Sequence, residues 1–349
     1  MTEMLPPWLL PAWQAVRARG ARLPHALLLT GPAGSGKRLF GERLAQALLC
    51  TQPDAQGFAC GQCKDCNWIA GGNHPDHFLL VPAADEAAEE EAEEGGKKEK
   101  TRSTQIVIDQ VRQLQSALEV GAGGHAGGRR VVLIDPAEAM NVAAANALLK
   151  SLEEPGENTV FILASDAPRK LLATIRSRCQ VIEFMPPPEA QAQAWLQAQD
   201  VADDALLGFA GGLPLAAKTL ATPVWLGLRR KLAEDLAQLG QRDPLRLAAE
   251  WEARLKAKDA LEAGFAMPTL IDWVQRWLAD GARVASGATP RFYADFAAAL
   301  QAQTRIPLLA WLESLRELDT HRRSASHPLN PRLFLEDLFL SMFRRLRAH

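Results

Sequence analysis

The sequence lacks a segment that could cross a membrane. No apolar run in its 349 residues approaches the roughly 20 residues that a spanning helix needs. Residues 1–20 carry an acid near their start, with no basic residue before the first apolar run and no small-residue cleavage site, so a secretory signal is not indicated. We therefore predict a cytoplasmic protein with no membrane partner.

The sequence also lacks an excess of basic residues. Lys and Arg number 39 against 41 Asp and Glu, which gives a formal net charge of -2 and a pI near 6.4. A protein whose main work is to wrap nucleic acid needs clustered cations to neutralise phosphates. That class is not favoured, and we expect any DNA contact made by this chain alone to be weak.

A phosphate-binding loop is present, but one of its functional positions is missing. Residues 31–38 read GPAGSGKR and keep the G-x-x-x-x-G-K frame between an apolar run and a helix-periodic segment. Arg38 stands where a Ser or Thr ligand to Mg²⁺ is required, and its charge repels the ion. Hydrolysis is therefore not expected, while nucleotide binding stays open. The candidate nucleotide-binding residues are Gly31, Gly34, Gly36, Lys37 and Arg38.

The acid that would activate a water molecule is missing as well. Asp135 ends an apolar run and remains as a residual metal ligand, but Pro136 replaces the second acid of the expected pair. Glu138 is displaced by two positions and does not fill that role by default. Ser165, at the end of the next apolar run, is a candidate polar sensor. We expect negligible ATP hydrolysis by the chain itself.

Four of the five cysteines lie close together, at Cys50, Cys60, Cys63 and Cys66. Disulfides are rare in cytosolic proteins, and four thiolates on one short loop provide a closed tetrahedral shell for Zn²⁺. Since no coordination position stays open, we predict a structural rather than a catalytic zinc. Redox thiols and unmetallated cysteines remain alternatives. His74 and His77 are interpreted as an ordinary loop residue and a strand start.

The triplet Ser177-Arg178-Cys179 follows a helix predicted to begin near Arg169, and it precedes the last predicted strand. Arg178 has two interpretations: a cation at a helix end, which the helix dipole favours, and an arginine finger that serves a neighbouring active site. Arg176 suits the first role equally well. Spacing alone favours the helix-end interpretation.

Apolar runs alternate with helix-periodic segments in the first half of the chain and predict a doubly wound parallel sheet. The runs lie at residues 25–31, 78–81, 131–135, 160–165 and 181–184. Prolines 186–188 end this pattern, and the remainder is almost wholly helical. Trp251, Trp273, Trp277 and Trp311 are predicted to pack in a helical core. Residues 83–104, an acidic block and then a basic one, are interpreted as a disordered insertion or a solvated helix tip, without an assigned function.

Several motifs together resemble the clamp-loader branch of the AAA+ superfamily. They are LPHALLLTGPAGSGK, the four-cysteine module, GNHPDHFLLV, NALLKSLEEP and LLATIRSRCQVIEF. Within that branch, a degraded phosphate loop combined with an intact SRC triplet resembles the delta-prime subunit family of bacterial DNA polymerase III. The resemblance covers nearly the whole chain and is strongest over residues 22–82 and 129–184.

The resemblance implies three domains and a place in a ring of subunits. Residues 1–185 would form an AAA+ module with the zinc insertion, 186–226 a helical lid, and 227–349 a helical collar. Arg178 would act as a finger toward the ATP site of an adjacent subunit, and Pro214 stands where a motor subunit carries a sensor arginine. The implied partners are tau or gamma and delta subunits, and through them the sliding clamp and primed DNA.

Two alternatives from the residues remain. An active tau- or gamma-type motor would need a Ser or Thr at 38, an acid at 136 and an arginine near 214, where this chain has Arg38, Pro136 and Pro214. A zinc-stabilised scaffold of the same assembly would keep the phosphate loop only as a relic.

Overall fold

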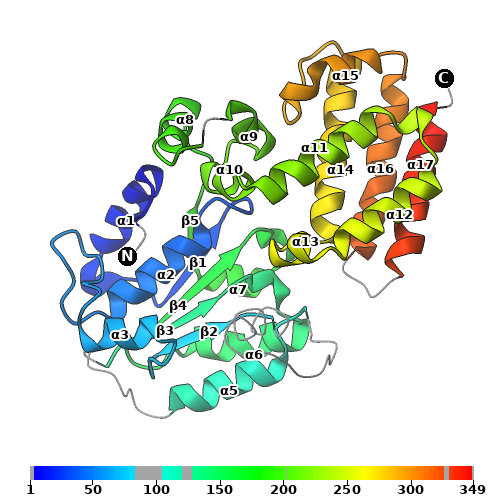
Figure 1. Cartoon of the computed structure of the whole chain (residues 1–349). Coiled ribbons are helices and arrows are strands. Elements are labelled where there is room, and N and C mark those ends of the chain that lie inside the picture. The colour runs from blue at the N-terminus through cyan, green and yellow to red at the C-terminus, as the bar shows by residue number, and fades with distance from the viewer. Residues whose placement is uncertain (1–3, 83–103, 120–127, 202, 326–329, 348–349) are drawn as a thin grey trace. The chain divides into compact units, whose positions relative to one another are not determined.

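The computed structural model describes residues 4–82, 104–119, 128–201, 203–325 and 330–347. The chain divides into two compact units, Met1–Met185 and Pro186–His349 (Figure 1). The charged block at residues 83–104, interpreted as a disordered insertion or a solvated helix tip, lies outside the described residues except for Thr104. Among the described helices, none is long and apolar enough to cross a membrane.

The first unit is built on a five-stranded parallel sheet in the order β2-β3-β4-β1-β5, which confirms the predicted architecture. The predicted apolar runs coincide with its strands, and the three inner strands are buried along their whole length because helices cover both faces. The strands are β1 (Ala26–Thr30), β2 (His77–Leu80), β3 (Arg130–Ile134), β4 (Thr159–Ser165) and β5 (Gln180–Glu183).

Helices cover both faces of this sheet (Figure 1). They are α1 (Leu10–Arg17), α2 (Lys37–Leu49), α3 (Lys64–Ala70), α5 (Ile108–Glu119), α6 (Val142–Glu153) and α7 (Ala173–Arg178), with short 3₁₀ turns at Pro7–Leu9, Gly20–Arg22, Ala137–Ala139 and Pro168–Lys170. Leu27 and Leu29 of β1 pack with α1 and α2, whereas Leu28 packs with α5, α6 and α7. This alternation follows from the period of two in a strand.

Helix α7 starts later than the sequence predicts. A helix beginning near Arg169 is wrong, because Pro168 opens a 3₁₀ turn and Leu171 and Leu172 are extended. The α-helix begins only at Ala173 and ends at Arg178.

The second unit is helical. Its helices are α8 (Glu189–Gln197), α9 (Asp204–Phe209), α10 (Pro214–Leu220), α11 (Pro223–Ala237), α12 (Pro244–Leu255), α13 (Lys258–Glu262), α14 (Met267–Ala285), α15 (Ala297–Ala302), α16 (Leu308–Ser324) and α17 (Pro331–Arg347), with 3₁₀ turns at Leu239–Gln241 and Ala294–Phe296. Helices α8, α9 and α10 share a small apolar cluster. Phe209 of α9, however, packs in the larger core of the following helices, and the separate lid and collar therefore stay a prediction.

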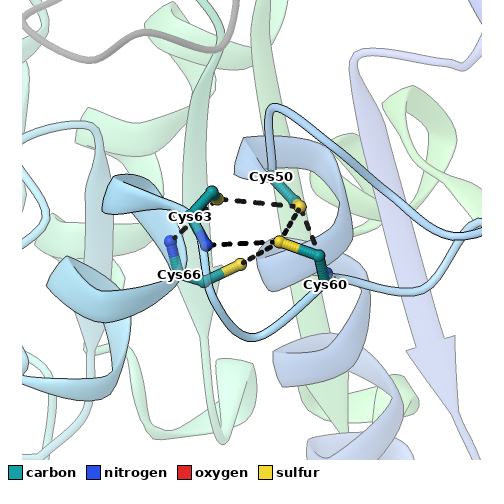
Figure 2. A group of neighbouring side chains, drawn as sticks. All are labelled: Cys50, Cys60, Cys63 and Cys66. Carbon is teal, nitrogen blue, oxygen red and sulfur yellow. Dashed lines mark hydrogen bonds between the residues drawn. The ribbon is translucent and has the colours of Figure 1, made fainter.

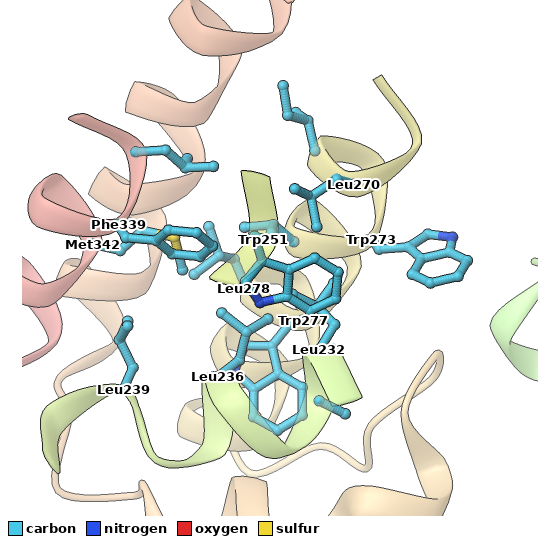
Figure 3. Close-up of a cluster of buried hydrophobic side chains, with 14 of the residues drawn as sticks. Leu232, Leu236, Leu239, Trp251, Leu270, Trp273, Trp277, Leu278, Phe339 and Met342 are labelled. Atoms are coloured by element: carbon cyan, nitrogen blue, oxygen red, sulfur yellow. The ribbon is translucent and has the colours of Figure 1, made fainter. Parts of the chain in front are cut away.

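Tryptophans fill the larger core of this second unit. Trp251, Trp273, Trp277 and Trp311 are each at most 2% exposed, which confirms their predicted packing role. Figure 3 shows Trp251 and Trp277 between leucines of α11 and α14 and the side chain of Phe339 from α17. Burial of such large side chains is a major source of stability for a helical bundle.

Candidate functional sites

The phosphate loop joins β1 to α2, and its glycines have conformations that other residues adopt with strain. Gly34 and Gly36 have φ of 81° and 96°, and Gly36 is the residue just before the helix. A Cβ at Gly31 would lie 2.3 Å from the backbone oxygen of Phe184, which follows β5. The loop therefore keeps the backbone of a phosphate site.

Lys37 is turned onto its own loop. Its Nζ donates hydrogen bonds to Gly31 O at 2.9 Å, Pro32 O at 2.8 Å and Ser35 Oγ at 3.2 Å. The ammonium also lies 2.5 Å from a carboxylate oxygen of Asp166, and the side chain is only 5% exposed. An ammonium has three donors, so acceptors within the chain already occupy all of them.

Arg38 lies between two acids. Its Nε is 2.9 Å from Oε1 of Glu42, one helical turn further on, and 3.8 Å from Oδ2 of Asp135. Burial raises the pKa of Asp135 to about 6, although the Arg38 charge opposes that shift. The structure thus brings together the two predicted residues, Arg38 and Asp135, and gives this acid a guanidinium neighbour.

Glu138 has a structural partner. Its Oε1 accepts hydrogen bonds from the backbone N–H groups of Asp166 at 2.9 Å and Ala167 at 3.0 Å. The carboxylate therefore holds the turn after β4. Ser165 is fully buried, and in the described part of the chain its Oγ has no hydrogen-bond partner.

Arg178 ends α7 at the surface of the first unit. Its Nη1 donates to Thr174 O at 3.0 Å, and its Nη2 lies 2.5 Å from Oε1 of Glu153 at the end of α6. The arginine side chain is 34% exposed. Helix α7 leads into the start of β5, where Gln180 pairs with Leu27 of β1. Arg178 is therefore at the amino ends of the strands, whereas the phosphate loop follows their carboxyl ends.

The four clustered cysteines come from two helix ends and the loop between them (Figure 2). Cys50 directly follows α2, Cys60 lies in the loop, Cys63 precedes α3 and Cys66 is in its first turn. The prediction that one short loop carries all four is therefore only partly right, since helices position three of them. Figure 2 shows the sulfurs facing one another.

The geometry of the sulfurs fits a tetrahedral metal site. All four Sγ atoms lie within 4.8 Å of one another, and three pairs are 3.6, 3.9 and 3.9 Å apart. A Zn–S bond of about 2.3 Å in a tetrahedron requires sulfurs about 3.8 Å apart. The backbone N–H groups of Cys60, Cys63 and Cys66 also point at cysteine sulfurs, at 3.3 to 3.4 Å.

The local environment lowers the pKa of two of the cysteine thiols and raises the pKa of the other two. Backbone N–H groups of Gln62 and Cys63 lower the pKa of Cys60. Burial opposes ionisation of Cys63, but hydrogen bonds from Thr51 and Cys66 lower its pKa to about 6. Burial raises the pKa of Cys50 and of Cys66. A cation that holds all four as thiolates would thus offset the cost of ionising the two buried ones.

A buried pair beside this module is not evident from the sequence. His74 is not an ordinary loop residue, because its Nε2 lies 3.3 Å from Oδ1 of Asp65 in α3, and both side chains are nearly inaccessible. The backbone N–H of Asp76 donates to Nδ1 of His74 at 3.1 Å. His77 starts β2, as predicted. In the sequence, only the short spacing of His74 and Asp76 before β2 hints at a buried histidine, and this spacing does not identify Asp65 as its partner.

A five-stranded parallel sheet with a glycine-rich phosphate loop after β1, followed by a helical second unit, defines an α/β P-loop protein. The family model for "DNA polymerase III, delta subunit" matches residues 13–188. The DNA polymerase III subunit delta′ of Pseudomonas aeruginosa is 40% identical over 279 residues, which cover 78% of this chain and 75% of that protein. The chain therefore belongs to the delta-prime subunit family of DNA polymerase III.

Two further comparisons are more distant. The DNA polymerase III subunit delta′ of Escherichia coli K12 is 32% identical over 288 residues, or 81% of this chain and 77% of that protein. A solved structure of a DNA polymerase III gamma subunit-related protein from Thermotoga maritima covers 97% of this chain and 99% of its own. Its TM-score is 0.46 and its sequence identity with this chain is 19%.

Proposed function

We propose that this chain is a non-hydrolysing subunit of the DNA polymerase III clamp loader. In this role it assembles with tau- or gamma-type and delta subunits and helps load the sliding clamp onto primed DNA. It supplies Arg178 to the ATP site of a neighbouring subunit. Membership in the delta-prime family supports the place in the assembly, and the position of Arg178 supports its role.

The observation that carries the proposal is the position of Arg178 relative to the sheet. Gln180 of β5 is level with Leu27 of β1, and the loop begins four residues later at Gly31. At about 3.3 Å per residue, Gly31 lies about 13 Å further along the strands than the paired residues Gln180 and Leu27. Arg178 is two residues further from the loop than Gln180. An arginine at the amino ends of the strands serves a phosphate on another subunit rather than its own.

The contacts within the phosphate loop of this chain support the proposal that it does not hydrolyse ATP. Lys37 has its donors occupied within the chain, and Arg38 lies beside the acid that would ligate Mg²⁺. Pro136 replaces the water-activating acid, and Pro214 begins α10 where a motor subunit would have its sensor arginine. Catalytic groups that act as a unit are not replaced by the ones that remain. These same positions argue against a tau- or gamma-type motor.

We also propose that the four cysteines hold one structural Zn²⁺. Cys50, Cys60, Cys63 and Cys66 are the ligands, and their spacing fits four thiolates around one ion. When bound, the ion joins the end of α2 to the start of α3. Its role is to stabilise the fold, since ligands present only in the folded state add binding free energy to folding.

Hydrolysis by the purified chain tests the first part of the proposal. We expect no ATP turnover above that of a Lys37→Ala control, with or without Mg²⁺. Turnover at the rate of a motor subunit, lost on Lys37→Ala, would refute a non-hydrolysing role. The measurement is steady-state phosphate release from protein free of other loader subunits.

A further inference from the structure

We propose that Glu153 is a positioning residue for Arg178. It holds the guanidinium in the orientation that a neighbouring subunit's ATP requires. This inference rests on the proposed role of Arg178 as a finger, and it adds a second residue, on a different helix, to that function.

The two residues end helices that pack together. Leu148 and Leu152 of α6 are buried in the same apolar cluster as Ile175 of α7. This packing fixes both helix ends, so the carboxylate of Glu153 and the guanidinium of Arg178 meet without a long flexible loop between them. Their Oε1–Nη2 distance is 2.5 Å.

The position of Glu153 is unfavourable for a carboxylate unless a cation compensates it. Glu153 is the last residue of α6, where the helix dipole disfavours negative charge. Arg178 provides the compensating charge. Glu154, the next residue, is equally acidic and exposed, but among the described residues its side chain has neither an ion pair nor a hydrogen bond. The pair is therefore specific to Glu153, and Glu154 is a matched control.

The contacts hold the arginine without occupying it fully. A guanidinium has five N–H donors, and the Thr174 carbonyl and the Glu153 carboxylate engage Nη1 and Nη2. Nε–H and one hydrogen on each terminal nitrogen remain for a phosphate. A partly exposed ion pair contributes little stability, so its consequence is orientation. Ordering a long side chain before its ligand arrives lowers the entropy that binding must offset.

The test uses a reconstituted loader in which only the ATP site facing this chain hydrolyses, because the phosphate-loop lysine is replaced in the other motor subunits. Glu153→Ala is expected to lower kcat about tenfold, with the KM for ATP unchanged, as for a group that acts in the transition state. Glu153→Gln keeps an acceptor oxygen and should stay within about threefold of the parent. Glu154→Ala should match the parent.

The double variant Glu153→Ala with Arg178→Ala should be no slower than Arg178→Ala alone, because Glu153 acts through the arginine. Parental kcat for Glu153→Ala, with Arg178→Ala slow, overturns the positioning role and leaves the finger intact. A faster Glu153→Ala protein overturns it too, since the carboxylate would then compete with the phosphate. Parental kcat for Arg178→Ala overturns the finger role itself, and this inference with it.

Discussion

The sequence shows directly that two residues needed for Mg²⁺ chemistry are replaced, but it does not show which acids contact the residues of the phosphate loop. Arg38 in place of a hydroxyl residue and Pro136 in place of an acid predict the loss of Mg²⁺ chemistry from residue type alone. The contact of Lys37 with Asp166 joins the ends of the adjacent strands β1 and β4, and that of Arg38 with Asp135 joins the ends of β1 and β3, which flank β4 in the sheet. Periodicity predicts the strands but not the side-chain rotamers at their ends.

The environment of Asp135 predicts a pH-dependent stability. Burial raises the pKa of this acid from 3.8 to about 6, so the folded chain binds the proton more tightly than the unfolded chain. Its contribution to the free energy of unfolding is present below pH 4 and is lost as the pH rises through 6. Asp135→Asn should therefore stabilise the chain at pH 7 by on the order of 2 kcal/mol.

Urea unfolding from pH 4 to pH 8 checks this prediction. The difference in unfolding free energy between Asp135→Asn and the parent should grow between pH 4 and pH 6 and then level off. A difference that stays flat across the range would show that Asp135 is not destabilised by burial.

At the scale of elements, strands were more predictable than helix ends. The inner strands β1, β3 and β4 are buried along their whole length, because helices cover both faces of the sheet. The start of α7 was mispredicted, since Leu171 and Leu172 fit a helical period yet are extended before Ala173. The cysteine spacing predicted the cluster, but not that the ends of α2 and α3 position it.

Zinc removal should destabilise the first unit. Cys63→Ser removes one ligand at the start of α3, and we expect less than one Zn²⁺ per chain and a lower melting temperature. Cys179→Ala changes the cysteine outside the cluster and should retain one Zn²⁺. Elemental analysis and thermal melting provide the measurements. Absence of zinc from parental protein purified without chelator, or an unchanged melt for Cys63→Ser, would contradict the metal site.

Gly281 permits the close approach of α14 and α16. A Cβ at this position would lie 2.4 Å from the ring of Trp311 in α16. Gly281→Ala should therefore destabilise the second unit by roughly 1–3 kcal/mol through overpacking. Gly227→Ala in α11 is the control, since its Cβ meets nothing within 4 Å, and there alanine should be neutral or stabilising. Equal melting temperatures for the two variants would show that this contact does not limit packing.

At the scale of the whole molecule, prolines 186–188 mark the division between the two compact units. Composition and periodicity separate an α/β part from a helical part with little ambiguity. The finer division of the helical part is harder to predict, because Phe209 of α9 stacks edge-on against Trp273 and Tyr293 of the larger core. The division of the helical part into a lid, residues 186–226, and a separate collar, residues 227–349, therefore remains a prediction.

We propose that this chain supplies Arg178 to the ATP site of a neighbouring subunit and does not itself hydrolyse ATP. A finger contributes on the order of 10³-fold at the site it serves, and a loader with several ATP sites dilutes that effect.

The direct measurement is clamp loading and DNA- and clamp-stimulated ATP turnover by a reconstituted loader containing Arg178→Ala, with Arg176→Ala from the same helix as control. We predict normal assembly and zinc content, slower turnover and loading for Arg178→Ala, and near-parental rates for Arg176→Ala. An Arg178→Ala loader that assembles normally and loads clamps at the parental rate would contradict the claim, and the chain would then be a zinc-stabilised scaffold with Arg178 as a helix-end cation.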